Sequence, residues 1–139
     1  MKTLIVGTGA LGGVIGAHLL AAGASVSLAT RSATAAEEIK AFGLRVTGIG
    51  GDLSAEAEEV ASLAEYSVPG TFDLIILATK AQDAIDAGPS LVRLLAPGGT
   101  LLPIQKRGST ANACQSARRA IRTRRALEPH SHNVEARAI

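Results

Sequence analysis

The ten residues LIVGTGALGG, at positions 4–13, join a short apolar run to a GxGxxG pattern of glycines. In this pattern Gly7 permits a tight turn, Gly9 lets the backbone approach a pyrophosphate, and Gly12 lets the following helix pack closely on the strand. A helix over residues 10–22 would direct its N-terminal N–H groups and its dipole at the phosphates. The pattern predicts a dinucleotide ligand; the alternative is a structural strand–turn–helix connection without a ligand.

The segments around the glycines support this prediction, which the pattern alone carries weakly in a chain of 15 glycines. Residues 2–6 are typical of a strand, and residues 25–29 are typical of a second strand after a turn at Gly23. Between the two strands, apolar residues recur at helical spacing at Leu11, Ile15, Leu19 and Leu20. This order of elements is the one that a nucleotide-binding βαβ unit requires.

The end of the second expected strand indicates which dinucleotide binds. NAD-binding units usually carry an Asp or Glu about 20 residues after the glycines, where it holds the ribose 2′-hydroxyl. This chain has Thr30-Arg31-Ser32 there and no carboxylate. Arg31 offers a planar, permanently charged donor group that suits a 2′-phosphate, with Thr30 and Ser32 as further hydroxyl donors. The expected cofactor is NADP(H), and the alternative is a solvated arginine at a strand end.

Length and composition indicate one domain with an aliphatic core. The chain has 139 residues, of which 47% are hydrophobic and 2% aromatic. Its single cysteine, Cys114, excludes an internal disulfide, and three histidines give no convincing zinc cluster, so we expect no metal. No motif places a base near Cys114, which we therefore interpret as a bystander and not a nucleophile. A reducing, cytoplasmic location fits this composition.

The first 22 residues resemble a signal peptide only in having Lys2 before a mostly apolar run. Five glycines by position 16 and the phosphate-loop spacing argue against that interpretation. No apolar run approaches the roughly 18 residues that a membrane-spanning helix needs, so no membrane association is expected.

Charge divides the chain into two parts. Residues 1–105 hold six Lys and Arg against ten Asp and Glu, whereas residues 106–139 hold eight against two. The net charge therefore changes near Gln105 from −4 to +6. We expect a nucleotide-binding domain over residues 1–105 and a basic tail, disordered or translated out of frame, over residues 106–139.

Strand and helix patterns continue to alternate after Arg31. Helices are expected over residues 33–42 and 81–95, the second with a potential interruption at Gly88-Pro89, and strands over residues 44–47, 72–78 and 100–104. Residues 52–68 stay open between a helix and short strands. The alternation predicts an α/β, Rossmann-like fold, a doubly wound parallel sheet covered on both faces.

Ligands of such sheets bind beyond the carboxyl ends of the strands. The loop at residues 7–12, Lys80 and the pair Gln105-Lys106 each follow an expected strand and should converge there. Lys80 could contact a phosphate, a ribose or a substrate carboxylate; the alternative is a solvated lysine after a strand.

From residue 1 to about residue 105 the chain resembles the N-terminal domain of the ketopantoate reductase (2-dehydropantoate 2-reductase) family. The resemblance rests on GTGALGG at 7–13, Arg31, ILATKA at 76–81 and LPIQ at 102–105. It implies NADPH-dependent reduction of 2-dehydropantoate, a small 2-oxo acid, to pantoate in the pathway to pantothenate and coenzyme A. The cofactor-binding residues that it implies are Gly7, Thr8, Gly9, Ala10, Leu11, Gly12, Arg31 and Lys80, the lysine on the nicotinamide side.

Two departures from the family pattern concern catalysis. The family has Gln-Asn-Gly, whose Asn contacts cofactor and substrate, where this chain has Gln105-Lys106-Arg107-Gly108. The family also continues into a helical C-terminal domain with the proton-donating lysine and most substrate contacts, for which residues 106–139 are too few. We therefore expect no catalytic residue in this chain. One extra adenine in the codons of Lys106-Arg107-Gly108 would explain the first departure, since its removal restores Asn-Gly.

Two other functions remain open at this stage. The first is an NADP-dependent reductase of the same plan that acts on another 2-oxo or imino acid. The second is a non-catalytic nucleotide-binding module whose arginine-rich tail binds a partner. Nucleic acid is not the expected partner, because the tail offers charge without aromatic stacking groups or a recognised fold. The oligomeric state is left open.

Overall fold

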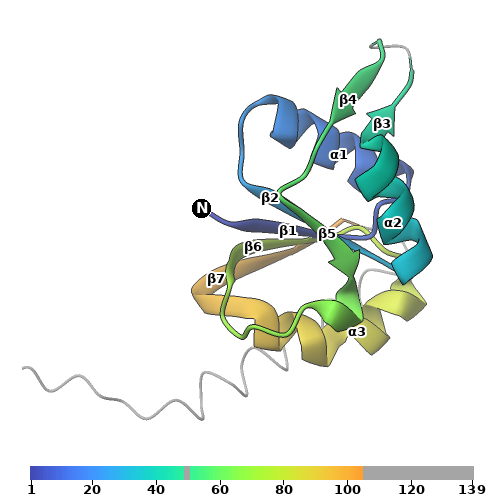
Figure 1. Cartoon of the computed structure of the whole chain (residues 1–139). Coiled ribbons are helices and arrows are strands. Elements are labelled where there is room, and N and C mark those ends of the chain that lie inside the picture. The colour runs from blue at the N-terminus through green and yellow to red at the C-terminus, as the bar shows by residue number, and fades with distance from the viewer. Residues whose placement is uncertain (49–50, 105–139) are drawn as a thin grey trace, which may run out of the picture.

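A computed structural model of the chain describes residues 1–48 and 51–104. A five-stranded sheet lies between helices, and a small two-stranded unit projects from it (Figure 1). The main strands are β1 (Thr3–Val6), β2 (Val26–Thr30), β5 (Glu59–Ser62), β6 (Phe72–Leu77) and β7 (Leu95–Pro103). The small unit consists of β3 (Leu44–Val46) and β4 (Leu53–Ala55), and the helices are α1 (Ala10–Ala21), α2 (Ala33–Phe42), the 3₁₀ turn η1 (Leu63–Glu65) and α3 (Ala81–Leu94).

The main sheet is entirely parallel, in the spatial order β5-β2-β1-β6-β7. Ile5 of β1 lies opposite Leu28 of β2 on one side and Ile76 of β6 on the other. The chain thus moves outward from β1 to β2 and β5, then returns to place β6 beside β1. This topology confirms the predicted Rossmann-like, doubly wound fold, whose switch point lies between β1 and β6.

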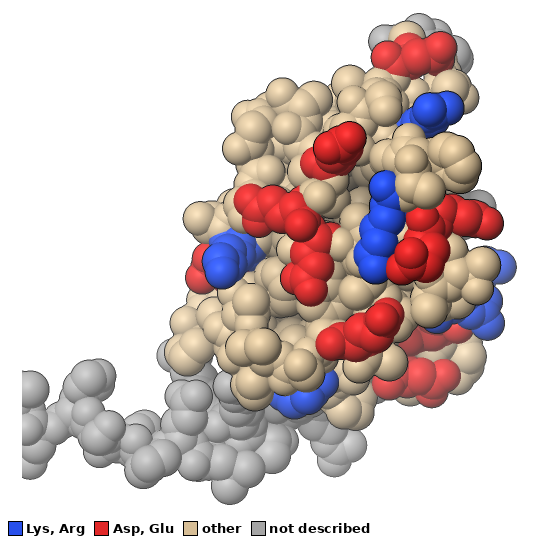
Figure 2. Space-filling view, viewed as in Figure 1, with Lys and Arg blue, Asp and Glu red and all other residues tan. Residues whose placement is uncertain are grey.

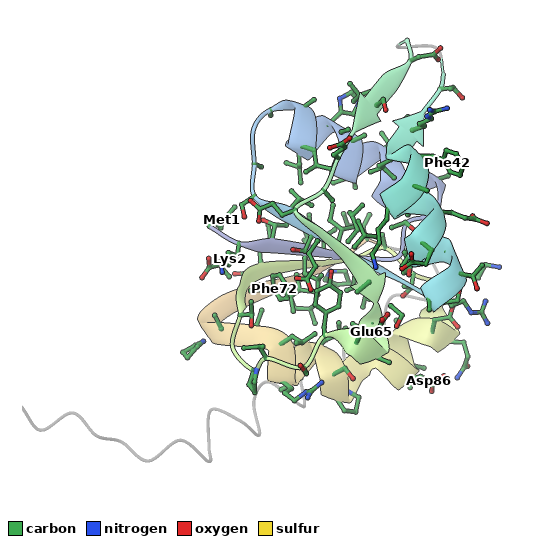
Figure 3. All side chains as sticks on the ribbon, viewed as in Figure 1. Met1, Lys2, Phe42, Glu65, Phe72 and Asp86 are labelled. Carbon is green, nitrogen blue, oxygen red and sulfur yellow. The ribbon has the colours of Figure 1, made fainter. Side chains whose placement is uncertain are left out.

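Both faces of the sheet are buried, because successive side chains along each strand point to opposite faces. Leu4 and Ile75 belong to a core cluster that includes Leu91 of α3, whereas Ile5 and Ile76 belong to a second cluster with residues of α1 and α2. Figure 1 shows α1 and α2 on one side of the sheet and α3 on the other. Phe72 points into the interior on the α3 side (Figure 3). The aliphatic core expected from composition is therefore formed in two layers.

The predicted bounds of α2 are those observed, because both ends carry local signals. Ser32 precedes the helix, and its hydroxyl oxygen accepts a hydrogen bond from the backbone N–H of Ala35 at 3.3 Å. Gly43 follows it with φ at 72°, a left-handed conformation that glycine adopts without strain.

Residues 44–68 depart from the expected arrangement. The strand expected at 44–47 forms as β3, but it pairs with β4 in the antiparallel unit and not in the main sheet. Arg45, in the middle of β3, is exposed, whereas an interior strand of a parallel sheet needs apolar residues on both faces. The open segment 52–68 forms β4, β5 and η1, and β5 takes the position beside β2.

Helix α3 continues through Gly88-Pro89, where the sequence left an interruption open. Gly88 has no Cβ to collide with the proline ring, which removes the usual steric penalty on the residue before a proline. The hydrogen bond that Pro89 cannot donate would end at the carbonyl of Ile85, whose residue is 40% exposed and accessible to water.

Strand β7 begins earlier than the expected strand over residues 100–104. Leu95 already pairs with Phe72, and after a register shift Thr100 pairs with Leu74. Pro97-Gly98-Gly99, a sequence typical of a turn, forms an irregularity within one strand, with Gly98 at φ 76°.

Candidate functional site

An open cleft of about 680 Å³ lies beyond the carboxyl ends of four neighbouring strands. Its walls come from the loops after β1, β2, β5 and β6 and from one face of α3. Met1 and Lys2 mark the opposite, amino end of the sheet, and Asp86 marks the cleft side of α3 (Figure 3). The cleft therefore occupies the place where doubly wound sheets bind ligands.

The glycine loop forms the part of the cleft at the switch point. Gly7 has φ at 96°, and a Cβ there would lie 2.8 Å from Cγ2 of Thr79. A Cβ on Gly12 would lie 1.9 Å from the carbonyl oxygen of Gly7, so the start of α1 packs on the loop too closely for any side chain. A Cβ on Gly9, by contrast, would meet nothing within 4 Å. The open space at Gly9 leaves room for a ligand to approach the backbone.

Gly9 is also the N-cap of α1, and no side chain caps the helix there. The first backbone N–H groups of a helix have no partner within the helix and carry part of its positive dipole. Such a helix start is a ready anion-binding site.

The predicted cofactor-binding residues fall into two groups. Gly7, Thr8, Gly9, Arg31 and Lys80 all line the cleft. The other three, Ala10, Leu11 and Gly12, do not line it: Ala10 and Leu11 are exposed at the start of α1, and Gly12 is buried against the loop.

Arg31 and Lys80 bring two positive charges to the same cleft, from the ends of β2 and β6. Both side chains are exposed, and neither makes an ion pair within the described part of the chain. No carboxylate stands at the end of β2, where NAD-binding units hold the ribose diol. The pair can attract phosphate groups without competition from a bonded acid.

Thr30 was expected to donate to the ligand, and the structure corrects this. Its side chain is 2% exposed, and its hydroxyl lies 2.7 Å from the carbonyl oxygen of Ser32 and 3.3 Å from that of Ala61. Thr30 lines the cleft, but its hydroxyl is engaged by the ends of β2 and β5. Ser32 lines the cleft, and its oxygen caps α2.

Sequence reasoning missed two walls of the cleft. One is formed by Ser62, Leu63 and Ala64 at the end of β5, and the other by Asp83, Asp86, Ala87 and Ser90 on one face of α3. A signal for the first wall was present, because Ser62-x-x-Glu65 is a capping-box sequence. Both hydrogen bonds of that box form, and the Ser62 hydroxyl and N–H lower the pKa of the Glu65 carboxyl by stabilising its charged form.

Tyr66 anchors the wall formed by Ser62–Ala64 to the sheet. Its hydroxyl donates to the carbonyl oxygen of Leu28 at 3.0 Å, and its ring packs edge-to-face on Phe72 with centroids 5.8 Å apart. Burial raises the pKa of Tyr66 well above its ordinary value, so the hydroxyl stays protonated and donates at any physiological pH. The Arg93 guanidinium donates to the carbonyl oxygen of Tyr66 at 2.9 Å.

A second hollow, of about 560 Å³, lies between α2 and the outer edge of β5. Four carboxylates and one lysine line it, namely Glu56, Glu58, Glu59, Glu65 and Lys40. Figure 2 shows acidic side chains gathered over this side of the molecule. Its charge is unsuited to an anionic nucleotide, which favours the first cleft.

Among residues 1–48 and 51–104, no group of three or more His, Cys, Asp and Glu could hold a metal ion. No helix of this part of the chain has the length and apolarity to cross a membrane. Gln105, Lys106 and Cys114 lie outside the described residues, as does the whole basic tail.

The parallel sheet, its switch point and the glycine loop beside it define a Rossmann-type α/β domain. A family model described as ketopantoate reductase PanE/ApbA matches residues 3–123, which is most of the chain. The chain belongs to this family.

Solved structures agree with this assignment. The 2-dehydropantoate 2-reductase from Methylococcus capsulatus is 29% identical with a TM-score of 0.61, over 84% of this chain and 38% of that one. A PanE/ApbA family ketopantoate reductase from Ralstonia eutropha JMP134 is 28% identical with a TM-score of 0.69, over 84% and 38%. D-mandelate dehydrogenase, solved with NADH and anilino(oxo)acetate, is 27% identical with a TM-score of 0.72, over 83% and 36%.

The chain thus spans less than half of each of these three proteins. A comparison with curated protein sequences gives no match.

Proposed function

We propose that this chain is the cofactor-binding part of an NADPH-dependent reductase of a small 2-oxo acid, with 2-dehydropantoate as the substrate. The observation that carries the proposal is the convergence of the glycine loop and Arg31 on one cleft at the switch point. Membership of the ketopantoate reductase family supports the reaction and the substrate.

The preference for NADPH follows from the end of β2. A 2′-phosphate carries up to two negative charges, and the Arg31 guanidinium can bind it through two parallel N–H donors. Lys80, on the same cleft, adds a second cation after β6. NADH has no 2′-phosphate for Arg31 to bind. The free ribose diol of NADH would also find no carboxylate at the end of β2.

Within this reaction the described residues bind and orient the cofactor. When bound, NADPH supplies the hydride. The glycine loop and the start of α1 would hold the pyrophosphate, and Arg31 would hold the 2′-phosphate. We assign no catalytic acid to this chain, and propose that the proton donor and the substrate contacts belong to the part of the family's length that the alignment does not cover.

The proposal is tested by titrating the 139-residue chain with NADPH and with NADH and following the fluorescence of the reduced nicotinamide. Arg31→Ala should weaken NADPH binding about tenfold or more and NADH binding less than about twofold, because a charged hydrogen bond to phosphate is lost. Arg45→Ala removes the same charge from exposed β3, away from the cleft, and should change neither affinity. An unchanged NADPH-to-NADH ratio in Arg31→Ala would overturn the assignment.

One observation favours a second candidate, a reductase of a different 2-oxo acid. D-mandelate dehydrogenase, whose solved complex holds NADH and anilino(oxo)acetate, has a TM-score of 0.72 with this chain. A panel of 2-oxo acids assayed with the complete gene product separates the two candidates. Turnover of an aryl-substituted oxo acid in preference to 2-dehydropantoate would favour the second.

Residues 106–139 have a net charge opposite to that of residues 1–105, and this charge favours a third candidate function, a non-catalytic nucleotide-binding module with a partner-binding tail. A salt-sensitive mobility shift of nucleic acid that disappears on deletion of residues 106–139 would support this candidate, and no shift at low salt would remove it.

A further inference from the structure

The cleft covers the part of the sheet's carboxyl edge that runs from β5 to β6. Its lining follows β5, β2, β1 and β6, and no described residue of β7 contributes to it. If the proposed function holds, with the pyrophosphate at the glycine loop and the 2′-phosphate at Arg31, the part of the cleft from the glycine loop toward β5 receives the adenosine end of NADPH. The adenine ring then lies beyond Arg31, toward the end of β5.

The walls at that end suit a flat base. Leu63 and Ala64 of η1 face the cleft from one side, and Ala87 of α3 faces it from another. Apolar side chains of this kind can flank an aromatic ring in a slot, and the orientation of a ligand in such a slot is set by a few polar groups.

Two carboxylates line the cleft next to this slot, although NADPH is an anion. Asp83 and Asp86 lie three residues apart on α3, on the same helix face as Ala87 and Ser90. Ionised carboxylates only accept hydrogen bonds, so they cannot hold a phosphate. They mark a place where the ligand presents N–H or O–H donors.

Two hydroxyls of the cleft wall opposite α3 are committed elsewhere. The Ser62 hydroxyl donates to the Glu65 carboxylate, and the Thr30 hydroxyl donates to the carbonyl oxygen of Ser32. Of the two carboxylates, Asp86 is exposed and Asp83 is half-buried. Within the described residues Asp83 makes no ion pair, and no side-chain hydrogen bond of it is found. A partly buried carboxylate without an ion pair or a hydrogen bond is unfavourable until a donor reaches it.

We propose that the Asp83 carboxylate accepts a hydrogen bond from the 6-amino group of the adenine ring and thereby selects adenine as the base of the cofactor. The 6-amino group is the one base substituent of the adenosine half that donates. Hypoxanthine carries a 6-oxo group in its place, which accepts hydrogen bonds and would face the negative carboxylate. The carboxylate therefore favours adenine by attraction and rejects hypoxanthine by repulsion.

The test compares NADPH with its hypoxanthine analogue, deamino-NADPH, on the 139-residue chain. The wild-type chain should bind the analogue about tenfold more weakly or worse, because a hydrogen bond to a charged acceptor is replaced by repulsion. In Asp83→Asn the ratio should fall to within about twofold, since an amide both donates and accepts. Asp52→Asn removes the same charge from an exposed position before β4, away from the cleft, and should keep the wild-type ratio.

Three results would overturn the inference. The first is an equal affinity of the wild-type chain for the two nucleotides, which needs no variant and so does not depend on how Asp83→Asn folds. The second is an unchanged ratio in Asp83→Asn together with weaker binding of both nucleotides, which would assign Asp83 to a ribose hydroxyl. The third is a loss of thermal stability alone, which would make Asp83 a helix-stabilising acid. If the wild-type chain binds neither nucleotide, the proposed function itself fails; if it binds both equally, only the role of Asp83 fails.

Discussion

Gly9 and Gly12 lie three residues apart in one motif, and the structure predicts opposite consequences for replacing each with alanine. At Gly12 the added methyl carbon would lie 1.9 Å from the carbonyl oxygen of Gly7. That oxygen cannot easily retreat, because the Gly7 N–H donates to the carbonyl oxygen of Ala29 at 2.9 Å and holds the loop to β2. At Gly9 the methyl carbon would meet nothing within 4 Å, and φ is an ordinary −67°.

The magnitudes follow from these contacts. Forcing one carbon into a packed site costs about 1–3 kcal/mol of stability. Because the added carbon would collide with a backbone oxygen, we expect Gly12→Ala to lose about 3 kcal/mol or more. At about 3–4 °C per kcal/mol for a domain of this size, its midpoint of thermal unfolding should fall by about 10 °C. Gly9→Ala should lose less than about 1 kcal/mol, the difference between glycine and alanine at an N-cap, yet should weaken NADPH binding at least about tenfold by blocking the approach of the pyrophosphate.

The assay is a thermal melt of each variant with and without NADPH, combined with a fluorescence titration at a temperature where all are folded. Gly9→Ala should melt like the wild type and lose the stabilisation that NADPH gives it. Gly12→Ala should unfold at a lower temperature than the wild type. Normal NADPH affinity in a folded Gly9→Ala protein would refute the idea that this loop holds the pyrophosphate. An unchanged melting temperature in Gly12→Ala would refute the close packing of α1 on the loop.

Two further predictions concern stability. Pro89→Ala should raise the free energy of unfolding by about 1–2 kcal/mol in urea denaturation, because alanine restores a backbone N–H at an exposed position of α3 and removes the steric penalty of proline. A loss of stability would indicate that the proline ring packs or that the helix ends there. Glu65 has a lowered pKa in the folded chain, so its contribution to stability is present above its unfolded pKa of about 4.3 and is lost as the pH falls through the folded pKa. Glu65→Gln should therefore show a flatter dependence of unfolding free energy on pH below about 4.5 than the wild type; parallel curves would contradict the role of the Ser62–Glu65 hydrogen bonds.

Local signals explain what the sequence predicts well. The glycine loop is fixed by turn chemistry within six residues, and α2 is fixed by Ser32 before it and Gly43 after it. Strand β6 is predicted because an uninterrupted apolar run is typical of an interior parallel strand. In each case the interactions that decide the element lie within a few residues along the chain.

The missed parts of the cleft depend on contacts that are distant in sequence. β5 takes its place through pairing with β2, where Ala61 lies opposite Ala29, and Tyr66 bonds to Leu28 across 38 residues. The capping-box sequence at Ser62 and Glu65 indicates a local turn, but no local pattern in residues 52–68 indicates that β5 pairs with β2. The Thr30 hydroxyl is engaged by one local and one distant contact, since it lies 2.7 Å from the carbonyl oxygen of Ser32 and 3.3 Å from that of Ala61 on β5.

Charge explains why cofactor choice should be a local property of this domain. Among the described residues ten carboxylates face six Lys and Arg, so the domain as a whole repels an anionic nucleotide. The acids gather over the β5 side, whereas Arg31 and Lys80 stand at the carboxyl edge. Added salt screens both the repulsion between the domain and the nucleotide and the attraction of Arg31 for a phosphate. The affinity for NADPH alone is therefore a poor measure of either interaction. The ratio of NADPH to NADH affinity cancels most of the common repulsion, and it therefore reports most directly on what Arg31 contributes.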